Sequence, residues 1–347
     1  PLNSIDDLNL IYKSSRPMLL RAYSSTDEVL KNGKLFDKHL NMAWHALSFW
    51  WFNTLDGRGP NSLEKSLFNH FELLEWLANN NRIFEPNVPH HFAFRGSDDF
   101  TFILSGFLAA KAAKMRGVKV LILQSMLNTP KTTPGITDII KNRTLYKLVK
   151  SLECDNFRIL FQPRAGLDFF SPDINLSKIQ LGQSTMLMDD IVHETNQSPE
   201  IIHVVSYSEG RFIASSKEII ESIKITKGML FEYRKLKQAG FNPDGINREE
   251  IDFVVDQKII IFNKIIKFLE NEVSDLYSPK GFYEIFKAGV LPVPYLWKER
   301  LDFENAINYN VKLMNGSYQF VDMKSKPINP YDRVMAVVDN HKTMKRN

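Results

Sequence analysis

The stretch DDFTFILSGFLAAKAAKMRGVKVLILQS (98–125) is the part of the sequence on which the fold prediction depends. Its first twenty residues read as a largely apolar helix that ends at Gly117, and glycine is the usual residue just past a helix end. The next eight residues, 118–125, form a short apolar run typical of a buried strand. A helix that leads directly into a buried strand indicates a parallel βα repeat.

Other apolar runs follow the same rhythm. Further strands are predicted at PMLLRAY (17–23), HHFAFRG (90–96), FRILFQ (157–162) and IIHVVSYS (201–208), and a helix at 62–80. LSFWWFN (47–53) is a strand or a buried turn, and we expect its aromatic residues in the core rather than stacked on a base or a corrin. The expected fold is α/β, a TIM-like (β/α) barrel.

The strand count falls short of a closed barrel. We find about six βα units where the closed form needs eight. Strands are therefore hidden in residues 1–60, or the barrel is open, incomplete at its N-terminus or completed by another chain. The later part changes character, with two long amphipathic helices at 215–239 and 248–273, a hairpin at 315–323 and a proline-rich turn at 326–333. We divide the chain into a barrel, 1–240, and a helical and irregular extension, 241–347, packed on it.

Composition excludes several classes of function. The net charge of the 347 residues is +4, but basic and acidic residues alternate, so we expect no nucleic-acid binding. No run reaches the ~18 apolar residues of a membrane span, and PLNSIDDLNL (1–10) does not resemble a signal peptide, so we expect a cytoplasmic protein with no membrane partner. The first proline is compatible with removal of an initiator methionine. A single cysteine excludes an internal disulfide.

An arginine lies at the end of four of the predicted strands or shortly after it. These arginines are Arg21, Arg95, Arg164 and Arg211. Functional residues of parallel α/β folds lie at the carboxyl ends of strands, and a guanidinium binds carboxylate or phosphate through a planar fork of donors. The four arginines are therefore candidates to bind a small carboxylate. The alternative for each is an ion pair with a nearby acid, namely Asp98, Asp99, Asp168 or Glu209.

Other familiar constellations are missing from the sequence. It contains no phosphate-binding glycine loop of a known pattern. His90 and His91 are adjacent on a predicted strand and would point to opposite faces, so we expect no metal site. Asp189 and Asp190 near His193 are either acid–base residues or helix caps, and capping is the simpler interpretation.

The order of segments resembles the catalytic (ε) subunit of coenzyme-B12-dependent glutamate mutase, also called methylaspartate mutase. The similar segments, which are collinear over nearly the whole chain, are RPMLLRAYSS (16–25), NSLEKSLFNHFELLEWL (61–77), AAKAAKMRGVKVLIL (109–123) and FKAGVLPVPYLW (286–297). The resemblance implies a TIM barrel, adenosylcobalamin supplied by a separate cobalamin-binding subunit, and an oligomer. The chain has no Asp-x-His-x-x-Gly cobalamin-ligand motif, so such a partner would be obligatory.

The resemblance also assigns residues that contact the substrate. Arg21 falls on one of the family's three arginines that grip the substrate carboxylates, and the other two have no counterpart. The family's catalytic glutamate falls on Ala43, and its two substrate-contacting tyrosines fall on Phe49 and Asn53. The catalytic residues of this chain are therefore unknown.

Three further positions correspond to residues around the cofactor. The family's lysine and glutamate that hold the adenosine fall close to Ser206 and Gly210, with Glu209 one place away, and a histidine falls on Gln162. Glu209, Gln162 and Ser206 are therefore the candidate cofactor-binding residues.

Two hypotheses remain open at this point. The chain is a divergent mutase subunit, an isomerase that rearranges a small carboxylate other than glutamate, or it is a catalytically degenerate barrel that serves as a binding or assembly protein without B12 chemistry.

Overall fold

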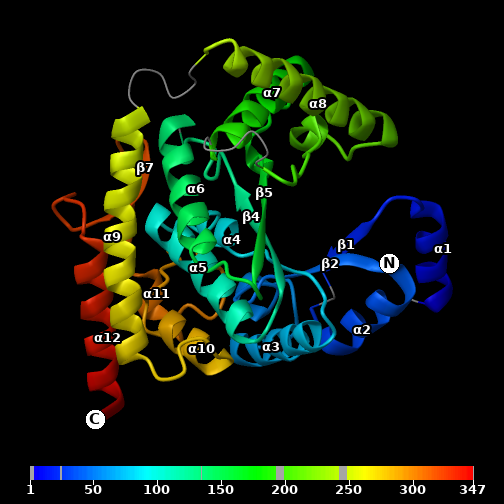
Figure 1. The fold of residues 1–347 in the computed structure, drawn as a ribbon. Coiled ribbons are helices and arrows are strands. Elements are labelled where there is room, and N and C mark those ends of the chain that lie inside the picture. Colours follow the sequence, from blue (N-terminus) through cyan, green and yellow to red (C-terminus); the bar gives the residue numbers. More distant parts are fainter. Residues whose placement is uncertain (1–3, 24–25, 134, 193–198, 242–247, 347) are drawn as a thin grey trace.

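A five-stranded parallel sheet is the centre of the computed structural model, which describes residues 4–23, 26–133, 135–192, 199–241 and 248–346 (Figure 1). The strands are β1 (Leu20–Tyr23), β2 (Met42–Leu47), β3 (Phe84–Pro86), β4 (Val120–Met126) and β5 (Arg158–Arg164). They lie side by side in chain order. All carboxyl ends therefore meet at one edge of the sheet, where ligands of parallel α/β proteins bind.

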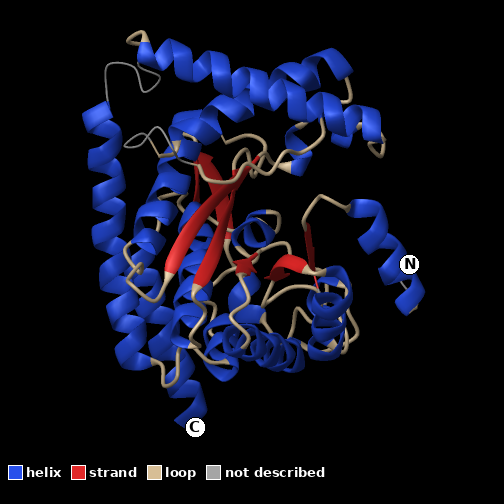
Figure 2. Cartoon of the chain, turned by 45° about the vertical axis from the view of Figure 1, so that its right-hand side comes forward, coloured by secondary structure: helices blue, strands red, loops and turns tan. Residues whose placement is uncertain are grey.

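Helices precede the sheet, connect its successive strands and follow its last strand (Figure 2). They are α1 (Ile5–Ser15), α2 (Val29–Leu40), α3 (Leu63–Asn79), α4 (Pro89–Ala93), α5 (Asp99–Met115), α6 (Gly135–Lys150), α7 (Ile174–Asp190) and α8 (Ser216–Gln238). Three short 3₁₀ turns lie at the carboxyl edge or near it, η1 (Thr54–Asp56), η2 (Leu167–Phe169) and η3 (Tyr207–Gly210).

The prediction from residues 98–125 is confirmed. The Asp98 side chain caps α5 by accepting a hydrogen bond from the Thr101 amide at 2.8 Å, and Gly117 ends the helix with φ +87°. An L side chain would be strained at that φ. The helix is buried on nearly all sides, which explains its uniformly apolar sequence. β4 then pairs with β5 in register from Val120 to Met126.

The predicted strand at 90–96 is wrong, because these residues form α4 and the turn after it. Pro89 occupies the first turn of the helix, where its fixed φ is favourable. The helix α4 is buried, as a strand of the sheet would be. A short apolar run does not distinguish a buried helical turn from a buried strand. The prediction that His90 and His91 point to opposite faces fails with it, since their ring centroids are 4.2 Å apart.

The alternative that strands are hidden in residues 1–60 holds for β2, which begins at Met42 and was not assigned to particular residues. The buried-turn interpretation holds for most of 47–53: Phe49 and Phe52 have φ of 47° and 68°, and the two tryptophans between them are in the core. β3 was not predicted; it has three residues, one of them Glu85 and one a proline.

The segment expected as a strand at 201–208 is only partly one. His203 forms a single parallel bridge with Arg164, and the Ile201 and His203 amides donate to β5 carbonyls at 3.1 Å each. The chain then turns into η3. The structure establishes an α/β fold with a five-stranded parallel sheet. Among the described residues no pairing between the first and last strands closes this sheet into a barrel.

The C-terminal part packs on the helices around the sheet. Its elements are α9 (Arg248–Glu272), α10 (Pro279–Lys287), α11 (Glu304–Ile307), β6 (Asn310–Met314), β7 (Ser317–Val321) and α12 (Pro330–Arg346). The long helices at 215–239 and 248–273 and the hairpin are confirmed. α9 lies against α6 and α12, and α10 lies against α3 (Figure 1). One hydrophobic core includes residues of both predicted parts, while the division at residue 240 stays a prediction.

Candidate functional site

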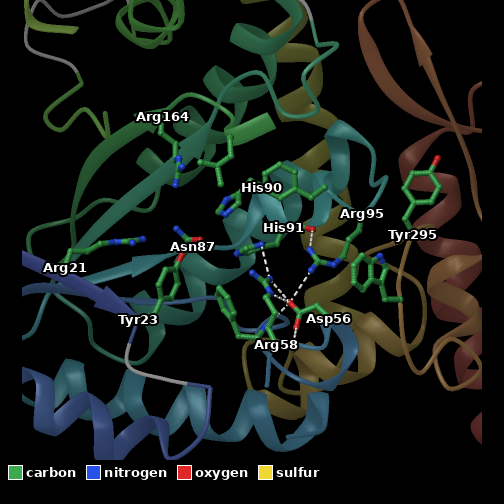
Figure 3. Close-up of a pocket in the computed structure, with 14 residues that line it drawn as sticks. Arg21, Tyr23, Asp56, Arg58, Asn87, His90, His91, Arg95, Arg164 and Tyr295 are labelled. Carbon is green, nitrogen blue, oxygen red and sulfur yellow. Dashed lines mark hydrogen bonds and ion pairs between the residues drawn. The ribbon is translucent and has the colours of Figure 1, made fainter. Parts of the chain in front are cut away.

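A cavity of about 660 Å³ opens at the carboxyl edge of the sheet (Figure 3). Its lining comes from β1, the loops after β2 and β3, the end of β5 and the C-terminal segment. The lining residues are Arg21, Tyr23, Phe52, Asp56, Arg58, Asn87, His90, His91, Phe94, Arg95, Arg164, Leu167, Tyr295 and Trp297. The position at the strand ends is the one that the parallel topology predicts.

Arg21, at one end of the cavity, has a buried counter-ion. Its Nε donates to Glu85 Oε2 at 2.9 Å and a second nitrogen donates to Oε1, so the pair is bidentate. Glu85 is fully buried and also accepts from Trp44 at 2.7 Å and from Asn87 at 2.9 Å. Burial alone would lower the pKa of Arg21, but the hydrogen bonds and charge of Glu85 outweigh it and raise that pKa. Arg21 is therefore neutralised within the protein.

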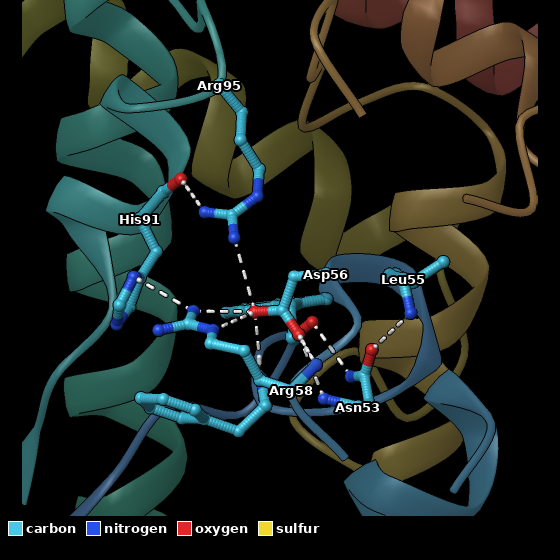
Figure 4. Close-up of polar contacts among 8 residues, drawn as sticks. Asn53, Leu55, Asp56, Arg58, His91 and Arg95 are labelled. Carbon is cyan, nitrogen blue, oxygen red and sulfur yellow. Dashed lines mark hydrogen bonds and ion pairs between the residues drawn. The ribbon is translucent and has the colours of Figure 1, made fainter. Parts of the chain in front are cut away.

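A second pair of arginines shares one aspartate (Figure 4). The buried carboxylate of Asp56 accepts from Arg58 Nε at 2.8 Å and from Arg95 Nη2 at 3.2 Å, and also from the Phe52 and Asn53 amides. Arg95 additionally donates to a backbone carbonyl at 2.7 Å and stacks on Trp51. Its pKa is lowered to about 10 by burial, which outweighs the charge of Asp56. Two cations and one anion leave a net positive charge on this side.

Arg164, the last residue of β5, is different. It is only 9% exposed, and among the described residues no carboxylate lies within ion-pair distance of its guanidinium. Its one hydrogen bond within the described chain is a long one, 3.4 Å from Nε to the Ala165 carbonyl. Burial lowers its pKa to about 10; Tyr23 acts in the opposite direction, Arg21 lowers the pKa further, and Glu85 and Glu209 raise it too little to compensate. Its charge is thus unmatched.

Two buried histidines lie between these groups (Figure 3). Burial, with the charges of Arg164 and other arginines, lowers the pKa of His90 well below its ordinary value, and burial does the same for His91. Both are neutral at pH 7. His91 Nδ1 lies 3.4 Å from Arg58 Nη2, which can only donate, so the proton of His91 is on Nε2. That Nε2 is buried without a hydrogen-bond partner among the described residues.

The C-terminal segment reaches the mouth of the cavity. The Tyr295 amide donates to the Arg95 carbonyl at 3.0 Å, and Ser97 Oγ donates to the Pro292 carbonyl. Gly96 has φ +79°, and a Cβ there would lie 2.6 Å from the Tyr295 ring. Only glycine allows the segment to lie this close, and the contact places Tyr295 and Trp297 on the cavity.

Three of the four predicted arginines therefore line one cavity, and Arg211 does not. Arg211 is exposed beyond η3. The alternative interpretation, an ion pair with a protein acid, holds for Arg21 and Arg95, although the acids are Glu85 and Asp56 rather than those suggested by the sequence.

The candidate cofactor-binding residues do not line this cavity. Ser206 Oγ caps η3 by accepting from the Ser208 amide at 3.3 Å, and Glu209 is exposed. Gln162 is buried within β5, with no partner for its Oε1 among the described residues. These three side chains do not converge on one described cavity.

Sequence reasoning missed several lining residues. Asp56 and Arg58 belong to the turn after β2, and Asn87 follows β3. Sequence reasoning did not predict β3 and gave no bounds for β2, so the carboxyl ends of these strands could not be searched. Tyr295 and Trp297 lie in FKAGVLPVPYLW (286–297), a segment that the sequence did single out.

The aspartates near His193 have structural partners. Asp189 binds Arg234 at 2.8 Å, and Asp190 accepts from Tyr233, so both carboxylates fasten α8 to α7. His193 lies outside the described residues. Within the described ranges no group of three or more metal-ligating side chains is placed to hold a metal ion, and no helix has the length and hydropathy needed to cross a bilayer.

Comparison with known proteins gave no match, either among protein-family models or among curated proteins. The resemblance to glutamate mutase therefore stays a prediction.

Proposed function

We propose that the cavity binds a small organic anion whose carboxylate pairs with Arg164. The observation that carries this proposal is the buried guanidinium with no carboxylate partner among the described residues. A buried, unpaired charge costs several kcal/mol, by general estimate, so a counter-ion from solution is strongly favoured. The surroundings agree, because the two acids Asp56 and Glu85 leave a net charge of +2 on the four arginines Arg21, Arg58, Arg95 and Arg164.

Isothermal titration with acetate, succinate, glutamate and inorganic phosphate tests the proposal. We expect saturable binding of at least one carboxylate to the full chain and loss of that binding in Arg164→Met. The matched control is Arg211→Met, since Arg211 lies outside the cavity. If only phosphate binds, the ligand carries a phosphate group and the proposed carboxylate is wrong. If Arg164→Met leaves the binding of the anion unchanged, the proposal is refuted.

The resemblance adds a finer proposal, an incomplete (β/α) barrel that rearranges a carboxylate with a cobalamin-binding partner. Sequential parallel strands and the bridge of His203 to β5 support the barrel. The donor set does not fit the cofactor, because Ser206 is used in a cap and Glu209 is exposed, so we derive no step through cobalamin. An oligomer and a cytoplasmic location stay predictions.

The second candidate is a binding protein without B12 chemistry, which Ala43 favours because it stands at the position of the family's catalytic glutamate. Titration of adenosylcobalamin, with and without a cobalamin-binding subunit, separates the two. Saturable cofactor binding supports the mutase, and its absence under both conditions supports the binding protein.

A further inference from the structure

The cavity is larger than a small carboxylate needs. Its volume of about 660 Å³ lies in the range of roughly 300–1,000 Å³ that holds ligands of drug size. Acetate or succinate at Arg164 would fill a small part of it. The remaining space is a feature that the proposed function does not explain.

The mouth of this space is apolar and exposed. Phe94 is 38% exposed, Tyr295 60% and Trp297 81%, and Leu167, three residues after Arg164, is 37% exposed. These side chains come from the end of α4, the start of η2 and the C-terminal segment, so the fold gathers them from three distant parts of the sequence. Exposed apolar side chains clustered at a cavity mark a surface that a ligand covers.

Arg164 lies across the cavity from Tyr295, while Arg95, which is paired with Asp56, lies next to Tyr295. Figure 3 places Arg164 and Arg21 toward one side and Tyr295 at the other, with His90 and His91 between them. The histidines are neutral, so the middle of the cavity favours an uncharged group. Asp56 neutralises one of the two charges of Arg58 and Arg95 and holds both guanidiniums, so a second carboxylate would meet a weaker site there than at Arg164, which has no carboxylate partner among the described residues.

We infer that the ligand is an amphipathic monocarboxylate, with its carboxylate at Arg164 and an apolar or aromatic body against Phe94, Leu167, Tyr295 and Trp297. This inference rests on the proposed function and narrows its ligand class from small anions to carboxylates with an apolar body. Burial of each methylene would tighten binding by about fourfold under ideal packing.

The test is a titration series with acetate, butyrate, hexanoate and 3-phenylpropionate, and with succinate and hexanol as comparisons. Hexanoate and 3-phenylpropionate are expected to bind at least tenfold more tightly than acetate, succinate no more tightly than acetate, and hexanol not measurably. A Tyr295→Ala/Trp297→Ala double variant should reduce the preference for hexanoate over acetate to less than threefold.

Trp297 supplies an independent signal, because it is the most exposed tryptophan while Trp50 and Trp51 are fully buried. Hexanoate should shift the fluorescence emission to shorter wavelength, and the shift should be lost in Trp297→Phe. Equal affinities for acetate and hexanoate, both lost in Arg164→Met, would overturn the inference and leave the proposed function standing. A hexanoate preference that survives Arg164→Met would also overturn it. No binding by any carboxylate would refute the proposed function itself.

Discussion

Replacing Arg164 by methionine should stabilise the protein while abolishing anion binding. The pKa of Arg164 is lowered to about 10 by burial, which corresponds to roughly 3 kcal/mol of penalty on the charged form in the folded state. Methionine has a similar length and no charge, and the only hydrogen bond lost within the described chain is the 3.4 Å contact with Ala165. We expect the free energy of unfolding at pH 7 to rise by about 1–3 kcal/mol.

The sign of the pH dependence follows from the same shift. The folded chain binds the Arg164 proton more weakly than the unfolded chain, so the penalty is complete below about pH 10 and fades as the pH rises through the folded-state pKa. Urea unfolding followed by circular dichroism at pH 7 measures the change. Arg211→Met, at an exposed position, should stay within about 0.5 kcal/mol of the parent. A loss of more than 1 kcal/mol in Arg164→Met would show that a protein group neutralises Arg164, and the reasoning would fail.

Three further predictions concern the groups around the cavity and the core. Glu85→Gln should lower the free energy of unfolding by about 3–5 kcal/mol, because it leaves Arg21 without its counter-ion. The additional change Arg21→Met should recover part of that loss. If urea unfolding shows no recovery in the double variant, the pairing of Arg21 with Glu85 is contradicted. Burial lowers the pKa of His70 to about 4, so the folded state resists protonation of this side chain and the free energy of unfolding falls as the pH drops below about 6.5. His70→Gln should reduce this fall between pH 6.5 and pH 4 by about 3 kcal/mol. An unchanged dependence of the unfolding free energy on pH would rule this out. Gly96→Ala should displace Tyr295 and weaken hexanoate binding more than acetate binding in titration, whereas equal effects on the two would argue against a contact between Tyr295 and the apolar body.

Part of the site could be predicted from the sequence. Arg21 and Arg164 were found because β1 and β5 have apolar runs that end near an arginine. Arg95 was also found, although the segment predicted as a strand before it forms the helix α4. Arg95 was therefore selected because it ends a buried apolar run, and the secondary structure assigned to that run was wrong. Asp56 and Asn87 were missed because the strands before them have no distinctive composition.

The sequence by itself determined the α/β alternation, the buried helix and strand at 98–125, and the long helices at 216–238 and 248–272, because caps and hydrophobic periodicity are local signals. The tertiary structure decided which arginines are neutralised. Glu85 is 64 residues from Arg21, and Asp56 is 39 from Arg95, so nothing local announces either pair. Arg164 differs from them only because the fold brings no carboxylate to it among the described residues. A charge balance of this kind depends on distances in space, and it is therefore visible only after the chain has folded.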